Sequence, residues 1–299
     1  MVSGTVLERD GAHYRVLTPD GELRAVLRKK VKREELRVVV GDRVRLEPEP
    51  GGALFGIIAV EPRRAVLERR VPEGRGTRIV VANLDEVFVV TATVDPAPIP
   101  QLLDRLLVLA EANEIEASVV VNKVDKAPAA PLASRFSRAG YRVLETSVAT
   151  GEGIAQFGAA LRGHTAVVTG PSGAGKSSLL NMVEPGLGLR TGEISEKVRR
   201  GRNTTVGALM VPLANGGFLV DTPGFSEVGL WGIDPRELAS CFPEMRPMLG
   251  ECRFQDCRHR TEPGCAIRAA VERGEIAADR LESYHVLLRE LEGAPREWE

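Results

Sequence analysis

Residues 170–178 read Gly-Pro-Ser-Gly-Ala-Gly-Lys-Ser-Ser and lie between an apolar run at 165–169 and a second apolar stretch at 179–183. This order predicts a buried strand, a tight loop and a helix. The spacing of the glycines and of the Lys-Ser pair matches a phosphate loop, in which backbone N–H groups surround a phosphate at a helix N-terminus. A glycine-rich turn without a ligand would explain the glycines but not the Lys-Ser pair.

Two side chains of this stretch have expected roles of their own. Lys176 is expected to reach the outer phosphates of a nucleotide, and the Ser177 hydroxyl is expected to coordinate Mg²⁺. The predicted phosphate-binding residues are Gly170, Pro171, Ser172, Gly173, Ala174, Gly175, Lys176, Ser177 and Ser178.

A second motif, Asn122-Lys123-Val124-Asp125, ends the β-rich run at 117–121. An aspartate in such an N-K-x-D motif accepts two hydrogen bonds from guanine, which adenine does not offer. We expect Lys123 to lie along the ring face and Asn122 to tie this loop to the phosphate loop. Alone the motif is a weak signal, but beside a phosphate loop it predicts a guanine nucleotide, GTP or GDP.

Two further segments are expected near the nucleotide. Ser147 and Val148 follow the apolar segment 141–144, and a backbone N–H there is expected to meet guanine O6. Asp221 begins an Asp-Thr-Pro-Gly sequence after the apolar run 217–220, which is also compatible with an ordinary Pro-Gly turn. In a nucleotide site Asp221 would lie close to Mg²⁺, and the N–H of Gly224 close to the γ-phosphate.

The polar segment 201–205 lies between the phosphate loop and Asp221. Thr204 and Thr205 are both candidates to complete the coordination of Mg²⁺ once GTP is bound, and we favour Thr205. The preceding residues 197–202 are strongly basic, which is typical of an RNA contact and equally of a solvated loop.

The order of these motifs is the most specific feature of the sequence. In a Ras-like chain the phosphate loop comes first and N-K-x-D last, whereas here Asn122 precedes Gly170. A circularly permuted chain still builds the same parallel sheet, because the site depends on where strand ends lie in space. With this order, the sequence resembles the RsgA/YjeQ family of small-ribosomal-subunit-dependent GTPases over nearly its whole length. Segments 191–195, 201–205 and 242–244 share the likeness.

The resemblance implies a GTPase that acts in late maturation of the small ribosomal subunit, contacts its rRNA and is stimulated by that particle. The implied catalytic groups are Lys176, Thr205, Gly224 and the residue at 203. Family members commonly carry a histidine there, where this chain has Asn203. An amide can hold a water but cannot become a cation near pH 7, so the partner of the attacking water stays open.

Two alternative functions remain at this point. The stretch at 170–178 also resembles the loop of guanylate-type nucleotide kinases, although N-K-x-D and D-x-P-G at strand ends argue against one. The second alternative is an RNA-binding nucleotide switch with negligible turnover, which Asn203 keeps open.

Length and charge set further limits. The chain has 299 residues and a formal net charge of −1, so two or three domains are expected and a uniformly basic nucleic-acid binder is excluded. Neither a signal pattern nor a run long enough to span a bilayer is present, so we expect a cytoplasmic monomer without a membrane partner.

The first predicted domain, residues 1–70, contains five short alternating segments at 3–8, 14–17, 23–27, 43–47 and 55–60, separated by Gly-containing turns. This spacing favours a small antiparallel barrel, an OB-fold that binds RNA. Lys29, Lys30 and Lys32 lie in its densest basic patch, which is expected to contact phosphates unless it is an ordinary solvated face.

The second predicted domain, residues 71–231, is the α/β GTPase domain. Residues 69–78 contain proline and glycines and are interpreted as a linker. A continuous β-rich run at 87–91 and an amphipathic pattern at 100–113 then predict the first strand and helix.

The third predicted domain, residues 232–299, contains four candidate metal ligands. Three thiolates and one imidazole form a closed tetrahedral shell suited to one structural Zn²⁺ without a catalytic role, although buried free cysteines are the alternative. The ligands are Cys252, Cys257, His259 and Cys265, and in the resembled family this pattern is the zinc site. Cys241 is expected in the core, and residues 266–292 are expected to form one or two helices around Gly274.

Overall fold

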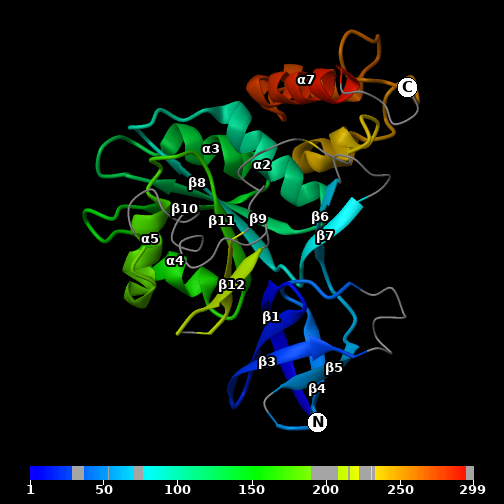
Figure 1. Cartoon of the computed structure of the whole chain (residues 1–299). Coiled ribbons are helices and arrows are strands. Elements are labelled where there is room, and N and C mark those ends of the chain that lie inside the picture. Colours follow the sequence, from blue (N-terminus) through cyan, green and yellow to red (C-terminus); the bar gives the residue numbers. More distant parts are fainter. Residues whose placement is uncertain are drawn as a thin grey trace.

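The computed structural model describes residues 1–28, 37–52, 54–70, 77–189, 208–214, 216–221, 230 and 233–293. Figure 1 shows three units: a barrel that contains the N-terminus, a central sheet covered by helices, and a helical unit near the C-terminus. In this described part of the chain, no helix is long and apolar enough to cross a bilayer.

The predicted barrel is confirmed. Its strands close in the order β1-β2-β3-β5-β4, with β3 and β5 parallel and the other pairs antiparallel. Apolar side chains at alternate positions, such as Val44 and Leu46, are fully buried and fill the interior. The strands are β1 (Val2–Asp10), β2 (His13–Thr18), β3 (Gly21–Leu27), β4 (Arg43–Pro48) and β5 (Phe55–Val60).

The central sheet has six strands in the order β10-β9-β8-β11-β13-β12. All neighbours are parallel except β12, which runs antiparallel to β13. Its strands are β8 (Glu86–Ala92), β9 (Glu116–Asn122), β10 (Arg142–Thr146), β11 (Thr165–Thr169), β12 (Leu209–Pro212) and β13 (Phe218–Asp221). The permuted order of the motifs therefore still yields one doubly wound sheet.

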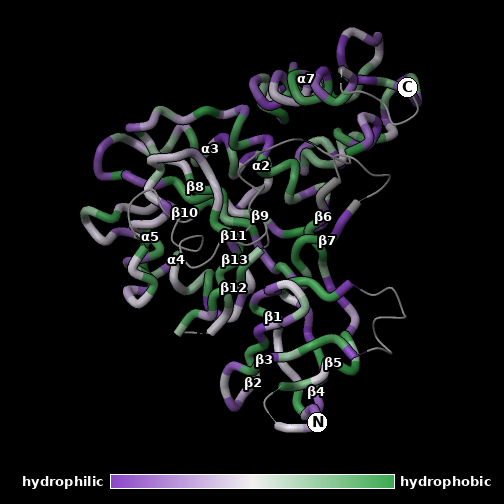
Figure 2. Tube along the Cα trace, viewed as in Figure 1, coloured by the Kyte–Doolittle hydropathy of each residue, from purple (hydrophilic) through white to green (hydrophobic). Residues whose placement is uncertain are grey.

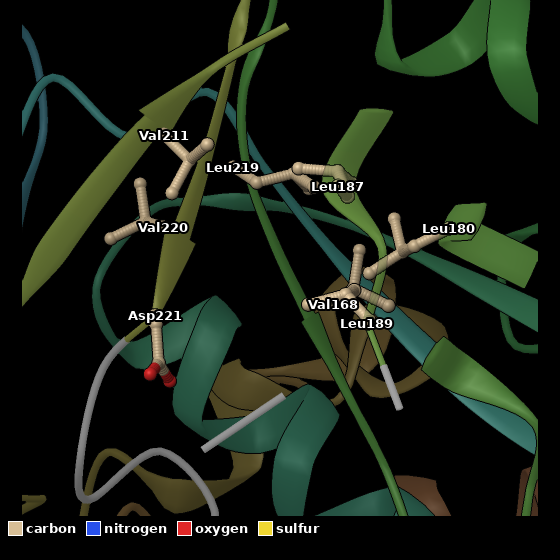
Figure 3. A pocket seen from close by; sticks show the side chains of 8 residues that line it. All are labelled: Val168, Leu180, Leu187, Leu189, Val211, Leu219, Val220 and Asp221. Atoms are coloured by element: carbon tan, nitrogen blue, oxygen red, sulfur yellow. The ribbon is translucent and has the colours of Figure 1, made fainter. Parts of the chain in front are cut away.

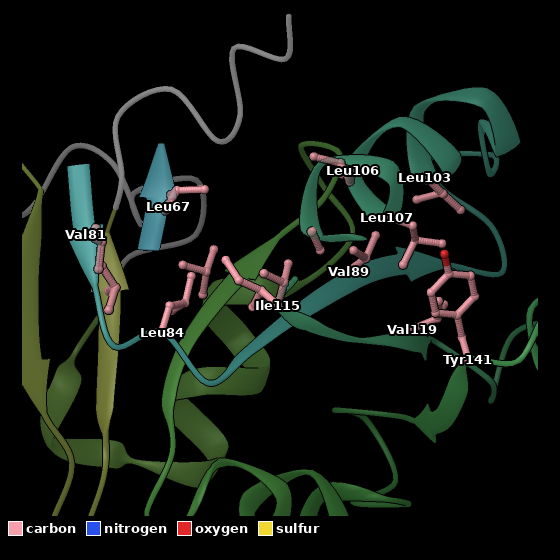
Figure 4. Close-up of a cluster of buried hydrophobic side chains, with 14 of the residues drawn as sticks. Leu67, Val81, Leu84, Val89, Leu103, Leu106, Leu107, Ile115, Val119 and Tyr141 are labelled. Carbon is pink, nitrogen blue, oxygen red and sulfur yellow. The ribbon is translucent and has the colours of Figure 1, made fainter. Parts of the chain in front are cut away.

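Helices cover both faces of this sheet because its middle strand is apolar on both sides. Val87 and Val89 of β8 pack with α2 (Pro100–Ala112) and α3 (Ala130–Arg138), as Figure 4 shows for Val89. Phe88 and Val90 pack on the opposite face with α4 (Ile154–Leu161) and α5 (Lys176–Val183). A 3₁₀ turn, η1 (Pro185–Leu187), follows α5. Figure 2 shows the same division, with apolar residues gathered along the central strands.

The linker interpretation of residues 69–78 is wrong at both ends. Strands β6 (Val66–Arg70) and β7 (Thr77–Ala82) pair antiparallel there, and residues 71–76 lie outside the described part. Short strands of this kind need a partner to bury their apolar side chains, and Leu67 and Val81 bury theirs against the central core. The two ends of this segment therefore belong to paired strands.

The barrel is attached to the central unit through the segment before β4. Val40 forms a parallel bridge with Val81, and the Asn83 side chain donates to the carbonyl of Gly41 at 2.9 Å. The adjoining Asp42 carboxylate is fully buried and accepts two hydrogen bonds from Arg63, at 2.7 and 2.9 Å. These contacts pack the barrel against the unit that contains the central sheet.

The C-terminal unit consists of η2 (Leu238–Cys241), η3 (Pro243–Met248), α6 (Ala266–Glu272) and α7 (Ala278–Gly293). The expectation of helices on either side of Gly274 is confirmed, and that glycine adopts a φ of 74°. Cys241 is buried in the apolar core of this unit, as expected.

A buried ionic cluster connects this unit to the central one. Asp104 of α2 is fully buried and accepts two hydrogen bonds from Arg135 of α3, at 2.7 and 2.8 Å. Arg280 of α7 donates to the same carboxylate at 2.6 Å and to Glu244 of η3 at 2.6 Å. Arg135 also pairs with the half-exposed Asp279 at 2.6 Å. The two cations thus face two buried carboxylates and one half-exposed one, so each charge named here has a partner.

The oppositely charged partners of Arg280 and Asp104 compensate for the desolvation cost of burying these two groups. Burial opposes the charge of Arg280, yet Glu244 and Asp104 raise the pKa of that guanidinium above its ordinary value. Burial likewise disfavours the Asp104 carboxylate, but Arg135 and Arg280 together hold the pKa of that carboxyl below its ordinary value. Asp104, Arg135 and Arg280 are therefore charged at neutral pH.

We expect Arg280→Met to lower the free energy of unfolding by about 3–5 kcal/mol, because the buried Glu244 loses its ion pair and Asp104 keeps only the one with Arg135. The measurement is denaturant unfolding followed by circular dichroism. Arg273→Met is the control, because its ion pair with Glu275 is solvent-exposed and contributes little. Equal losses in both variants would contradict the role of the cluster.

The same experiment has an expected pH dependence. Since the folded-state pKa of Asp104 is lowered, its contribution to stability is complete above the unfolded-state pKa of about 4. It is lost as the pH falls through the lower, folded-state pKa. The difference in stability between wild type and Arg280→Met should therefore shrink on acidification, and a constant difference would contradict the assignment.

Candidate functional site

The predicted phosphate loop connects β11 to α5 at the carboxyl edge of the parallel sheet. Gly170 has a φ of 134°, and a Cβ there would lie 2.0 Å from the carbonyl oxygen of Val90 on the neighbouring strand. Gly175, with a φ of 96°, comes so close to Asn122 that a Cβ would lie 2.3 Å from its Nδ2. Both glycines are therefore required by close approach to other strands.

Asn122 joins the two predicted nucleotide loops. Its Nδ2 donates to the carbonyl of Ala174 at 2.9 Å, and its Oδ1 accepts from the Thr146 hydroxyl at 3.3 Å. The side chain is buried, so water does not compete for these bonds. The expected tie between the N-K-x-D loop and the phosphate loop is confirmed.

Lys123 extends over the phosphate loop. It adopts a φ of 63°, and its Nζ donates to the carbonyl of Gly173 at 2.9 Å and also to that of Asp95. The aliphatic stem therefore bridges two loops, in the place where a nucleobase ring could stack against it.

Asp125 is oriented by a neighbouring hydroxyl. Ser147 Oγ donates to Asp125 Oδ1 at 2.5 Å and itself accepts from the Thr150 amide at 3.2 Å. The Ser147 amide donates to the carbonyl of Glu152 at 3.0 Å. Of the two residues expected to offer an N–H to guanine O6, Ser147 thus uses its own amide within the loop, which leaves Val148 as the candidate.

At the start of α5, Lys176 folds back over the phosphate loop. Its Nζ donates to the carbonyls of Gly170 and Pro171, at 2.8 and 2.9 Å. Burial lowers the pKa of this ammonium group below its ordinary value. The next residue, Ser177, is buried, whereas Ser172 and Gly173 are exposed at the tip of the loop.

Asp221 ends β13, which pairs with β11, so its carboxylate lies at the same edge of the sheet as the phosphate loop. Figure 3 shows it beside a small apolar pocket of about 40 Å³ between β11, β13 and α5. Seven of the eight lining residues are apolar, so this pocket does not suit a phosphate. Asn203, Thr204, Thr205 and Gly224 lie outside the described residues.

The four candidate metal ligands come together in the C-terminal unit. One ligand atom from each of Cys252, Cys257, His259 and Cys265 lies within 4.8 Å of all the others. His259 Nδ1 is 3.6 Å from the sulfur of Cys252 and 3.5 Å from that of Cys265. The cluster could hold a metal ion such as zinc.

The surroundings of this cluster suit a metal site. The amide of Ala266 donates to Cys252 Sγ and that of His259 to Cys257 Sγ, both at 3.4 Å, which stabilises thiolates. Burial lowers the pKa of His259, so its imidazole is neutral at pH 7. His285 donates to the carbonyl of His259 at 2.9 Å and holds that loop. Burial raises the pKa of the Cys257 thiol, so metal binding must displace its proton.

Three contributors to the nucleotide site were not predicted from the sequence: Thr93, Asp95 and the hydroxyl of Thr146. Thr93 and Asp95 belong to the loop after β8 and contact Lys123, about thirty positions further along the chain. Thr146 lies next to Ser147, so its position in the same segment was the one signal available.

Comparison with known proteins gives consistent results. A family model described as RsgA GTPase matches residues 60–231. A protein of Gemmatimonas aurantiaca named small ribosomal subunit biogenesis GTPase RsgA is 48% identical, covering 97% of this chain and 98% of that protein. A protein of Moorella thermoacetica with the same name is 44% identical, covering 97% of each chain.

Two solved structures share the whole fold. The crystal structure of YjeQ from Thermotoga maritima superimposes with a TM-score of 0.81 at 34% identity, covering 98% of this chain and 99% of that one. YloQ, described as a circularly permuted GTPase, superimposes with a TM-score of 0.78 at 26% identity, covering 99% of this chain and 97% of the other.

Proposed function

The chain belongs to the RsgA GTPase family, and we propose that its hydrolysis of GTP to GDP and phosphate serves the maturation of the small ribosomal subunit. The main support for the proposed nucleotide site is the buried hydrogen bond from the Asn122 side chain to the Ala174 carbonyl. This hydrogen bond joins the N-K-x-D loop to the phosphate loop. The particle follows from the names of full-length relatives, which are small ribosomal subunit biogenesis GTPases.

Guanine recognition is assigned to Asp125 and Val148. The Asp125 carboxylate, held by Ser147, accepts from the guanine N1–H and from the 2-amino group. The amide of Val148 donates to guanine O6. Lys123 lies along the base, because its ammonium group is held over the phosphate loop.

We expect Asp125→Asn to weaken GTP binding by about 10- to 100-fold, since an amide donor then faces two guanine donors. Xanthosine nucleotides carry a carbonyl in place of the 2-amino group and should bind the variant better than they bind wild type. Titration calorimetry measures both affinities, with Asp20→Asn in an exposed barrel turn as the control. Unchanged GTP affinity in Asp125→Asn would rule out the assignment.

The phosphates are assigned to the backbone N–H groups of residues 170–178, with Lys176 on the outer phosphates. Mg²⁺ would be held by Ser177, with Asp221 nearby and Thr205 or Thr204 completing the shell. When bound, the ion neutralises charge that develops on the transferred phosphoryl group. Positioning and charge neutralisation are the main sources of catalysis in such sites, with the N–H of Gly224 contributing at the γ-phosphate.

The kinase alternative is not favoured, because the guanine-reading loop and the phosphate loop belong to one joined site. Assays of phosphoryl transfer to GMP test it directly. A nucleotide switch with negligible turnover would bind GTP but release no phosphate even with small subunits present.

We further assign one structural Zn²⁺ to the C-terminal cluster. A tetrahedral zinc with bonds of about 2.3 Å to sulfur and about 2.05 Å to nitrogen separates the two ligand atoms by roughly 3.6 Å. The distances from His259 Nδ1 to the sulfurs of Cys252 and Cys265, 3.6 and 3.5 Å, fit this value. Four protein ligands complete the shell and leave no position for a catalytic water.

We expect Cys257→Ala to lose its zinc and to destabilise the loop 252–265, while GTP binding persists at the distant nucleotide site. Metal content by emission spectrometry and nucleotide affinity are the two measurements. Cys241→Ala provides the matched control, because that cysteine is buried in the same unit outside the cluster and should retain one zinc per chain. One zinc retained in Cys257→Ala would refute the ligand set.

The small ribosomal subunit is the proposed activator and RNA partner. Phe225 follows Gly224, at the position where Ras-like enzymes carry a water-orienting glutamine. Turnover alone should therefore be about 10⁻⁴ to 10⁻³ s⁻¹, as in small GTPases. Small subunits should raise this rate, whereas large subunits should not. Equal turnover with and without small subunits would contradict the proposed partner.

Replacement of Lys29, Lys30 and Lys32 by Glu should weaken subunit binding. In a plot of the logarithm of the binding constant against the logarithm of the salt concentration, the slope should become shallower by about one for each lost phosphate contact.

A further inference from the structure

Thr93, which follows β8, contacts the main chain on both sides of Lys123. Its hydroxyl donates to the carbonyl of Lys123 at 2.7 Å, and its amide donates to the carbonyl of Asn122 at 3.0 Å. The peptide groups before and after Lys123 are thus both bonded to one residue. This contact joins the loop after β8 to the guanine-reading loop.

Lys123 is a position where the backbone needs such support. Its φ of 63° places the backbone in the left-handed region, which residues other than glycine rarely adopt. The carbonyl of Lys123 also accepts from the Lys126 amide at 2.9 Å, which closes the turn. Thr93 and Asp95 of one loop therefore hold Lys123 at its main chain and at its ammonium group, respectively.

The direction of this turn decides where Asp125 points. Asp125 comes two residues after Lys123, and the intervening amide of Val124 donates to the carbonyl of Thr146 at 3.2 Å. A rotation of the peptide group after Lys123 would move the Asp125 carboxylate relative to Ser147, which holds it. The hydrogen bond from Thr93, together with the one to Thr146 and the one from Lys126, therefore helps to fix the orientation of the carboxylate.

We propose that Thr93 is a positioning residue for guanine recognition, which holds the left-handed turn at Lys123 so that Asp125 receives both guanine donors. The inference rests on the proposed guanine site. A carboxylate in a bidentate pair must be oriented at both oxygens, whereas a single hydrogen bond tolerates more rotation. Loss of Thr93 should therefore affect the guanine base more than hypoxanthine, which lacks the 2-amino group.

The test is Thr93→Val, which removes the hydroxyl and keeps the shape of the side chain. We expect the Kd for GDP to rise about five-fold, the equivalent of one ordinary hydrogen bond. The Kd for inosine diphosphate should rise less, so that the ratio of the Kd for inosine diphosphate to the Kd for GDP falls. Thr93→Ser keeps the hydroxyl and should restore both values. Titration of wild type and both variants, as full chains, with each diphosphate gives the six affinities.

The matched control is Thr18→Val, because the Thr18 hydroxyl donates to the carbonyl of Gly21 at 2.8 Å in the barrel, far from the nucleotide loops. This variant should bind both diphosphates as wild type does. If Thr93→Val fails to fold, Thr93→Ala removes the same hydroxyl and supports the same comparison.

Two results would overturn the role of Thr93. One is an unchanged GDP affinity in the hydroxyl-free variants, and the other is an equal loss for GDP and inosine diphosphate, which would indicate general loosening of the site. Both leave the proposed function intact if wild type still prefers GDP to ADP. A wild type without that preference would instead refute the guanine site itself.

Discussion

The bond from the Asn122 side chain to the Ala174 carbonyl is the interaction on which the nucleotide site depends. It joins a loop that follows β9 to a loop that follows β11, across 52 positions of the chain. Because it is buried, both loops must approach closely, and Gly175 is required where a Cβ would collide with Asn122. The loops proposed to bind guanine and phosphate are thus joined directly, and Thr146 donates a hydrogen bond to the other end of the same amide.

The permuted order of the motifs does not prevent the same sheet from forming. Strands β8, β9 and β10 precede β11 in the chain, yet β8 pairs with β11 and completes a parallel sheet whose carboxyl ends share one edge. A ligand at that edge contacts strand ends that are neighbours in space, whatever their order in sequence. The likeness to YloQ, described as a circularly permuted GTPase, agrees with this topology.

The C-terminal unit is joined to the sheet by charge as well as by apolar packing. Asp104 lies on α2, the helix that follows the loop containing Thr93, and it bonds to Arg280 on the C-terminal helix. Burial of a single charge would be costly, but here each buried cation and each buried carboxylate has an oppositely charged partner. The same helix, α7, contributes His285, which donates a hydrogen bond to the carbonyl of His259 in the cluster of three cysteines and one histidine. One helix therefore contacts both the central unit and the cluster.

Local patterns in the chain were enough to predict several parts of this protein. Spacing predicted the phosphate loop, the N-K-x-D motif, the four candidate metal ligands and the barrel strands, because each depends on residues near one another in the chain. The pairing of the strands at 66–70 and 77–82 was seen only in the folded chain, since such short strands are stable only when paired. The tertiary structure alone placed Thr93 against Lys123 and Arg280 against Asp104, contacts that span 30 and 176 positions. A single polar residue has no periodicity that reveals its partner, so such contacts are decided by how the strands and helices pack.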